Sequence, residues 1–142
     1  MNRPAASDAA TRARMRRQRR RATRPEELVK LLVRELGHAY RLNMQSLPGS
    51  PDLSNQTRGW AVFVHGCYWH HHVGCSRATV PKRNRDWWVA KFRRNRARDQ
   101  AKEEAVRAAG LRVMVIWECE LRDQDGVRQR LTDFLGPAPS IG

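Results

Sequence analysis

The side chains best suited to chemistry are concentrated in one stretch, AVFVHGCYWHHHVGC, at residues 61–75. Four of the five histidines and two of the three cysteines of the chain lie between His65 and Cys75. The apolar run that precedes them has the composition of a buried strand. Imidazoles and thiols at this density favour a metal site, a hydrolytic site, or both.

Three cysteines and one histidine have the spacing of a zinc site. Cys67, His72 and Cys75 lie within nine residues, and Cys119 follows a second apolar run, LRVMVIW. Three thiolates and an imidazole form a closed tetrahedral site, and sulfur ligands select zinc over magnesium or calcium. Spacing alone leaves open the choice between His72 and the two histidines before it. The alternatives are three free buried thiols or a disulfide, which the odd number of cysteines and a reducing cytoplasm disfavour.

Since such a zinc site uses one histidine, His65 and His70 remain for other chemistry. His65 ends the run AVFVH, and Asp52 stands thirteen residues earlier, after Ser-Pro. A carboxylate can hold Mg²⁺ against a phosphate, and an imidazole can take a proton from water, so this combination suits hydrolysis. Taken singly, a turn aspartate and a buried core histidine are the simpler interpretations.

The hydrophobic pattern indicates an α/β domain with a mixed central sheet flanked by helices. The first helix has the capping-box pattern TRPE at its start and Gly37 at its end. Asn84 is expected to cap a long helix that ends near Ala109, and Asp123 to cap the last helix. Strands are expected at residues 39–43, 60–66 and 111–117, with a short extended piece after LPGSPDL.

The formal net charge of +14 indicates a polyanionic partner, and nucleic acid is the first candidate. We expect a basic flexible arm at residues 1–22, one folded domain at 23–136 and a disordered tail at 137–142. Residues 1–24 carry +8, which leaves +6 on the rest of the chain, so the domain itself is basic. No apolar run could span a membrane and no secretory signal is present, so the expected location is the cytoplasm, at the nucleoid.

Five segments together resemble the very-short-patch mismatch repair endonuclease (Vsr) family: TRPE, LPGSPDL, AVFVHGCYWH, VPKRNRDWWVAKFRRNRARD and AAGLRVMVIWECEL. The resemblance implies a restriction-endonuclease-like core, a variant of the PD-(D/E)XK fold. Phe63 and His65 would stand where a second acid and a lysine usually follow the aspartate. The implied activity is nicking one strand of duplex DNA on the 5′ side of the thymine in a T:G mismatch, which deamination of 5-methylcytosine produces.

The resemblance also implies roles for individual residues. Asp52 matches a catalytic aspartate that binds Mg²⁺ together with the main-chain carbonyl of Val64. His65 and His70 match two active-site histidines, and Glu26 an acidic residue of the first helix that reaches the site. The structural zinc ligands carry over to Cys67, His72, Cys75 and Cys119.

Matching aromatic side chains intercalate into the DNA beside the mismatch, and here they are Tyr68, Trp69 and Trp88. For Trp88, a core position at helical spacing is the alternative. Residues expected to support the site or contact DNA are Asn95, Asp99, Lys82, Arg83, Arg85 and Lys91. We expect a monomer, with mismatch-repair proteins as candidate partners.

Two rival interpretations remain open at this stage. One is a nuclease of different target specificity on the same fold. The other is a zinc-stabilised module that binds duplex DNA without cutting it. The joint presence of Asp52, His65 and His70 favours the enzyme.

Overall fold

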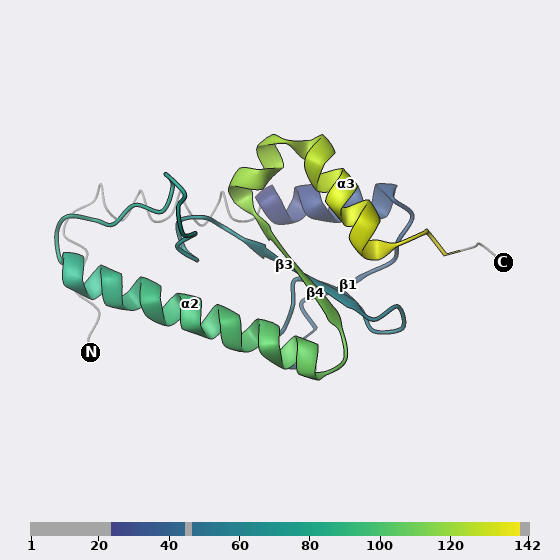
Figure 1. Ribbon diagram of the computed structural model, residues 1–142, viewed down its shortest axis with the longest axis horizontal. Coiled ribbons are helices and arrows are strands. Elements are labelled where there is room, and N and C mark those ends of the chain that lie inside the picture. Colours follow the sequence, from purple (N-terminus) through teal and green to yellow (C-terminus); the bar gives the residue numbers. More distant parts are fainter. Residues whose placement is uncertain (1–23, 45–46, 140–142) are drawn as a thin grey trace.

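The computed structural model describes residues 24–44 and 47–139, which form a sheet with helices on both faces (Figure 1). The expected arm at residues 1–22, the capping residue Thr23 and the end of the expected tail lie outside the described residues.

The sheet contains four strands in the order β1-β2-β3-β4. The strands are β1 (Arg41–Leu42), β2 (Leu53–Asn55), β3 (Trp60–His65) and β4 (Arg112–Trp117). The first three pair antiparallel, whereas β3 and β4 run parallel, which confirms the predicted mixed sheet. Every residue of β3 is buried, as its continuous apolar sequence predicts for a strand covered on both faces. His65 lies opposite Trp117 in the parallel register, so β3 and β4 end at the same edge of the sheet.

The remaining elements are a first helix at residues 24–35, α2 (Arg85–Ala108), the short 3-10 helix η1 (Glu118–Arg122) and α3 (Gln124–Leu135). The first helix and α3 pack on one face of the sheet in a core that includes Val62 and Leu131. On the other face, Val106 of α2 packs with Phe63. Because side chains alternate along a strand, His65 faces the α2 layer together with Phe63.

Two of the predicted helix caps can be compared with the structure. Asp123 caps α3 as predicted, since its side chain accepts a hydrogen bond from the Gly126 N–H over 3.0 Å. The predicted cap at Asn84 is wrong: α2 begins directly after it, but its side chain makes no capping hydrogen bond. Asn84 has a left-handed backbone, with φ 58° and ψ 38°, whereas side-chain capping requires an extended one.

Candidate active site and metal centre

A cleft of about 480 Å³ opens where the end of β3 meets α2 and the start of the first helix. Residues far apart in the sequence line it. The acids and histidines among them are Glu26 from the first helix, Asp52 from the segment before β2, His65 and His70 from β3 and the loop after it, and Asp99 from α2. The structure therefore brings together all four residues that the sequence suggested as catalytic.

The carboxylate of Asp52 is held by the main chain of β3. The Val64 N–H donates a hydrogen bond to Asp52 Oδ2 over 2.7 Å. Burial raises the pKa of Asp52, and the Val64 hydrogen bond and the charge of His70 oppose that rise. Burial also raises the pKa of Glu26, and the negative charge of Asp52 raises it further. Two carboxyl groups that repel each other in a half-buried cleft suit a divalent cation, which would offset both charges.

The segment that carries Asp52 rests against α2 at Gly49. Gly49 has a φ of +84°, and a Cβ placed there would collide with the Lys102 carbonyl oxygen and lie 2.9 Å from Val106 Cγ2. Only glycine allows both this backbone conformation and this approach. The contact therefore sets how far Asp52 stands from α2.

We expect Gly49→Ala to lower the midpoint of thermal unfolding clearly more than Gly59→Ala does. Both residues have positive φ, so both variants bear a backbone strain of about 1–3 kcal/mol. A Cβ at Gly59 meets no described atom within 4 Å, so only Gly49→Ala adds a collision with the helix backbone. Equal midpoints for the two variants would show that the contact with α2 carries no strain.

Two stacked histidines and an aspartate form the second part of the cleft. The rings of His65 and His70 stack with centroids 4.0 Å apart, and His70 Nδ1 donates to Asp99 Oδ2 over 2.7 Å. This hydrogen bond leaves His70 Nε2 as the nitrogen that can accept a proton. Burial lowers the pKa of His65 to about 4, so this ring is neutral near pH 7. Neither ring nitrogen of His65 has a hydrogen-bond partner among the described residues.

One face of α2 lines the cleft, and sequence reasoning identified only part of it. Lys91, Asn95 and Asp99 were expected to take part, and Arg98 and Lys102 were missed. All five follow the helical spacing that starts at Lys91, so the periodicity could have revealed the other two. Asn95 Nδ2 also donates to the Trp69 carbonyl oxygen over 3.2 Å, which ties the loop after β3 to α2.

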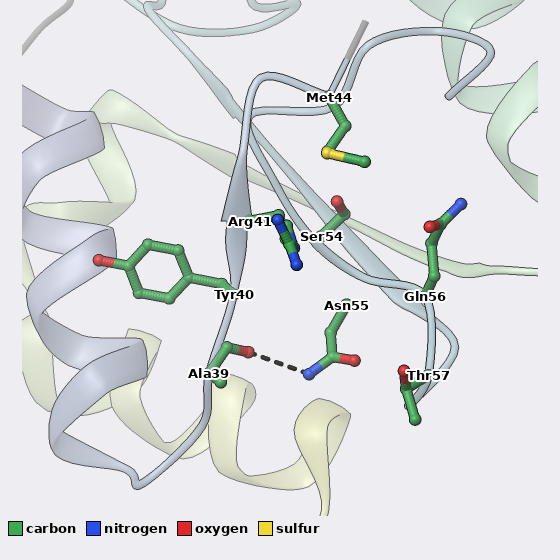
Figure 2. A pocket seen from close by; sticks show the side chains of 8 residues that line it. All are labelled: Ala39, Tyr40, Arg41, Met44, Ser54, Asn55, Gln56 and Thr57. Atoms are coloured by element: carbon green, nitrogen blue, oxygen red, sulfur yellow. Dashed lines mark hydrogen bonds between the residues drawn. The ribbon is translucent and has the colours of Figure 1, made fainter. Parts of the chain in front are cut away.

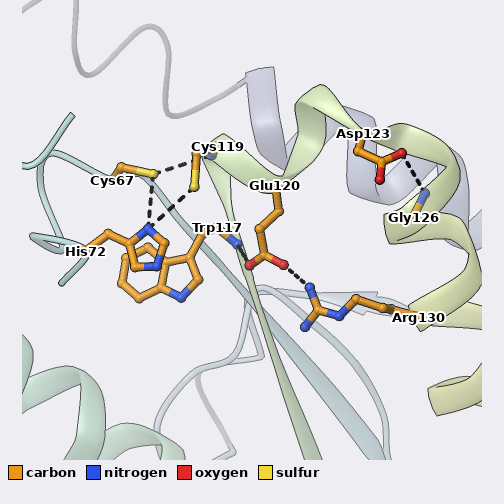
Figure 3. A network of polar contacts seen from close by, with 8 residues as sticks. All are labelled: Cys67, His72, Trp117, Cys119, Glu120, Asp123, Gly126 and Arg130. Carbon is orange, nitrogen blue, oxygen red and sulfur yellow. Dashed lines mark hydrogen bonds and ion pairs between the residues drawn. The ribbon is translucent and has the colours of Figure 1, made fainter. Parts of the chain in front are cut away.

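Cys67, His72, Cys75 and Cys119 converge at the end of the sheet. Their candidate ligand atoms all lie within 4.8 Å of one another. His72 Nδ1 lies 3.7 Å from the Cys67 sulfur and 3.5 Å from the Cys119 sulfur (Figure 3). The His72 ring stacks flat on Trp117, with centroids 4.0 Å apart, so Nδ1 is fixed toward the sulfurs. These four side chains are the set that the sequence suggested for zinc.

The chemistry of this cluster fits a metal ion. Burial raises the pKa of the Cys67 thiol to about 12, so this sulfur would stay protonated unless a cation stabilised the thiolate. Three sulfurs and one nitrogen at this separation match a tetrahedral zinc centre. The geometry favours His72 over His71 as the ligand, because His71 points elsewhere: its ring stacks on Phe92 at 4.3 Å and its Nδ1 lies 3.0 Å from an Arg96 nitrogen.

The three candidate intercalating residues lie close together, but two of them are covered. Tyr68 and Trp88 are only 3% and 6% exposed and pack around Phe92. Trp69 is half-buried and meets Tyr68 edge-on, with centroids 5.2 Å apart. Trp87 packs edge-on against Trp88 in the same cluster. In this conformation Trp69 is the member of the set nearest to the cleft, which it lines.

Outside the cleft, the surface carries three further residues that were expected to contact DNA. Lys82, Arg83 and Arg85 are exposed at the start of α2, where they were expected to contact DNA.

A second hollow at the edge of the sheet, beside β1 and β2, is lined by residues that include Arg41, Ser54 and Asn55 (Figure 2). Among the described residues, those that line this hollow include no carboxylate, histidine or cysteine. Among residues 24–44 and 47–139, the helices are too short or too polar to cross a bilayer.

Comparison with known proteins connects this site to a family. A family model described as DNA mismatch endonuclease Vsr matches residues 6–77. The type II nicking enzyme V.XorIIP of Xanthomonas oryzae pv. oryzae is 44% identical over 124 residues, which cover 87% of this chain and 90% of that protein. The type II nicking enzyme V.NmeAIP of Neisseria meningitidis is 38% identical over 109 residues, 77% of each protein. The DNA mismatch endonuclease Vsr of Escherichia coli is 37% identical over 127 residues, which cover 89% of this chain and 78% of that enzyme.

Proposed function

Because the chain belongs to the DNA mismatch endonuclease Vsr family, we propose that it nicks one strand of duplex DNA on the 5′ side of the thymine in a T:G mismatch. The nick would begin the short-patch repair of deaminated 5-methylcytosine. The observation that carries the proposal is the cleft in which Asp52, Glu26 and His70 lie together beside cationic residues of α2. We further propose a restriction-endonuclease-like core, which the mixed sheet with helices on both faces supports.

We propose that Asp52 and the main-chain carbonyl of Val64 hold Mg²⁺, with Glu26 as a neighbouring acid. The Val64 side chain is buried in the core on the far face of the sheet, so the cleft meets this residue at its main chain. Oxygen groups of this kind fit the preference of Mg²⁺ for one or two carboxylates plus substrate phosphate. A bound Mg²⁺ would offset the negative charge that builds on the phosphate during cleavage.

His70 is the residue that we assign to take a proton from the attacking water. The carboxylate of Asp99 holds Nδ1 of His70 and favours the positive charge that the ring gains with the proton. His65 is buried and neutral, and it supports the His70 ring by stacking against it. We assign a structural role to zinc at Cys67 and its three partner ligands, because four protein ligands leave no position for a catalytic water.

The proposed function is tested with end-labelled duplexes that differ in one base pair. In Mg²⁺, a T:G duplex should be nicked once, 5′ of the thymine, while the C:G duplex of the same sequence stays intact. Cleavage of both duplexes would show a nuclease of another specificity. Binding of both without cleavage in Mg²⁺ would show a DNA-binding module that is not an enzyme.

We expect Trp69→Ala to weaken binding of the T:G duplex about tenfold or more, because stacking of a base on an aromatic ring contributes about 1–3 kcal/mol. The reason is that Trp69 lines the cleft and is less covered than Tyr68 and Trp88, so it can reach the DNA first. Binding isotherms measure the affinity, and zinc content and thermal unfolding show whether the fold is intact.

Trp87→Ala is the matched control for this prediction, since Trp87 belongs to the same aromatic cluster but is not one of the three residues proposed to intercalate. It should bind the T:G duplex nearly as well as the parent protein. If Trp69→Ala nicks the mismatched duplex as efficiently as the parent, or loses activity only through unfolding, intercalation by Trp69 is wrong.

A further inference from the structure

Apart from the histidines, every cation among the described residues that line the cleft comes from one element, α2. The sheet contributes Val64 and the neutral His65, so no strand supplies a positive charge. The cationic residues are Lys91, Arg98 and Lys102. The Lys91 ammonium lies over the Trp87 ring, 5.3 Å from its centroid. Within the described part of the chain, Lys102 forms neither an ion pair nor a side-chain hydrogen bond.

The main chain of Lys102 is fixed against the segment that carries Asp52. Gly49 approaches so closely that a Cβ there would collide with the Lys102 carbonyl oxygen, and Asp52 follows only three residues later. The charge of Lys102 acts across the cleft: it opposes the rise that burial causes in the pKa of Asp52, and it adds to the fall that burial causes in the pKa of His65. The side chain is exposed, so its ammonium can reach a ligand in the cleft.

We propose that Lys102 binds the DNA phosphate that is cut, and that it brings from α2 the cation that β3 does not provide. The assignment rests on the proposed function. Glu26, Asp52 and Asp99 all repel a phosphate, and one divalent cation bound at Asp52 offsets only part of that charge. An ammonium that donates to a phosphate oxygen forms a charge-assisted hydrogen bond, and this bond strengthens as negative charge develops during cleavage.

The test compares three variants of the full chain: Lys102→Gln, Lys102→Arg and the control Arg93→Gln. Arg93 is exposed on α2, and nine residues are two and a half helical turns, so it lies on the opposite side of the helix. In single-turnover nicking of the T:G duplex, Lys102→Gln should be slower by at least about tenfold, since it removes a group that stabilises developing charge. Lys102→Arg keeps the charge and Arg93→Gln leaves the cleft unchanged, so both should stay near the parent rate.

A second measurement does not depend on cleavage. Without divalent metal, the logarithm of affinity for the same duplex decreases linearly with the logarithm of salt concentration. The magnitude of this slope should be smaller by about one in Lys102→Gln than in the parent protein, which reports one lost phosphate contact. Parent-like rate and slope in Lys102→Gln would overturn the assignment. A smaller magnitude of the salt slope together with a parent-like nicking rate would also overturn the assignment, because Lys102 would then bind a phosphate that is not cut. If the parent protein nicks no duplex, the proposed function fails, and the slope alone still decides whether Lys102 contacts a phosphate.

Discussion

Asp52→Ala should bind a T:G duplex as tightly as the parent protein and leave it intact in Mg²⁺. Asp52 is the carboxylate that β3 holds most firmly, through the 2.7 Å hydrogen bond from the Val64 N–H. The Mg²⁺ that we propose at this position would contribute several kcal/mol to the transition state, so its loss should slow nicking by about a thousandfold or more. Affinity should be preserved, because removing a negative charge from the cleft does not weaken its attraction for DNA.

Two further variants separate catalysis from folding. Asp52→Asn keeps an oxygen that can accept from the Val64 N–H, so it should melt like the parent protein yet remain inactive. Asp133→Asn changes an exposed aspartate of α3, far from the cleft, and should nick normally. Nicking by Asp52→Asn within tenfold of the parent rate would remove Asp52 from the proposed metal site.

The structure brings together the four residues that the sequence suggested as zinc ligands, and this agreement has a chemical reason. Few residue types can bind zinc, and the loop from Cys67 to Cys75 is too short to place its ligands far apart. The long-range partner, Cys119, follows β4, which pairs in parallel with β3 and ends at the same edge. Apolar runs in the sequence indicated both strands. The four residues could therefore be assigned to one site before the pairing of the strands was known. Spacing alone left the choice among three adjacent histidines open, the resemblance implied His72, and the structure places His72 in the cluster.

The position of each aromatic side chain could not be predicted in this way. His71 adopts a left-handed φ of 48° in the loop after β3. In the same loop Tyr68 packs against Phe92, while Trp69 lines the cleft. A one-dimensional pattern does not encode such a turn, since residues other than glycine seldom adopt it. The same limit applies to Asn84, whose residue type suits a cap but whose backbone is left-handed.

Lys102 shows a different limit of sequence reasoning. Its helical spacing from Lys91 was visible in the sequence, but how closely that face of α2 would approach Asp52 was not. The approach is set by packing, through the contact of Gly49 with the helix backbone. The predicted site therefore contained the acids, the histidines and Lys91, and lacked Arg98 and Lys102.

Cys119→Ser should lose both the metal and the native fold. Cys119 is the proposed ligand that joins the end of β4 to the loop after β3, and its N–H also lies 3.4 Å from the Cys67 sulfur. Structural zinc binding contributes about 10–16 kcal/mol in small zinc domains. That is as large as the whole stability of a typical domain, about 5–15 kcal/mol. We therefore expect the Cys119→Ser protein to contain less than one zinc per chain by elemental analysis. We also expect that, when it is heated from room temperature, it shows no cooperative unfolding transition.

Unfolding from any cause would also release zinc. Two further variants, one that replaces a ligand by another ligand and one that changes a neighbouring residue, therefore complete this test. Cys75 is partly exposed at the open side of the cluster, so Cys75→His can supply an imidazole in place of the thiolate and should retain one zinc and a cooperative transition. Glu118→Gln, next to Cys119, breaks the ion pair with Arg77 but keeps all four ligands, and it should retain zinc as the parent does. A Cys119→Ser protein that is folded, nicks DNA and contains no zinc would show that the four residues are ordinary packed side chains. Their convergence at the end of β3 and β4 would then need another explanation, since the positions of Trp69 and His70 depend on the loop that they hold.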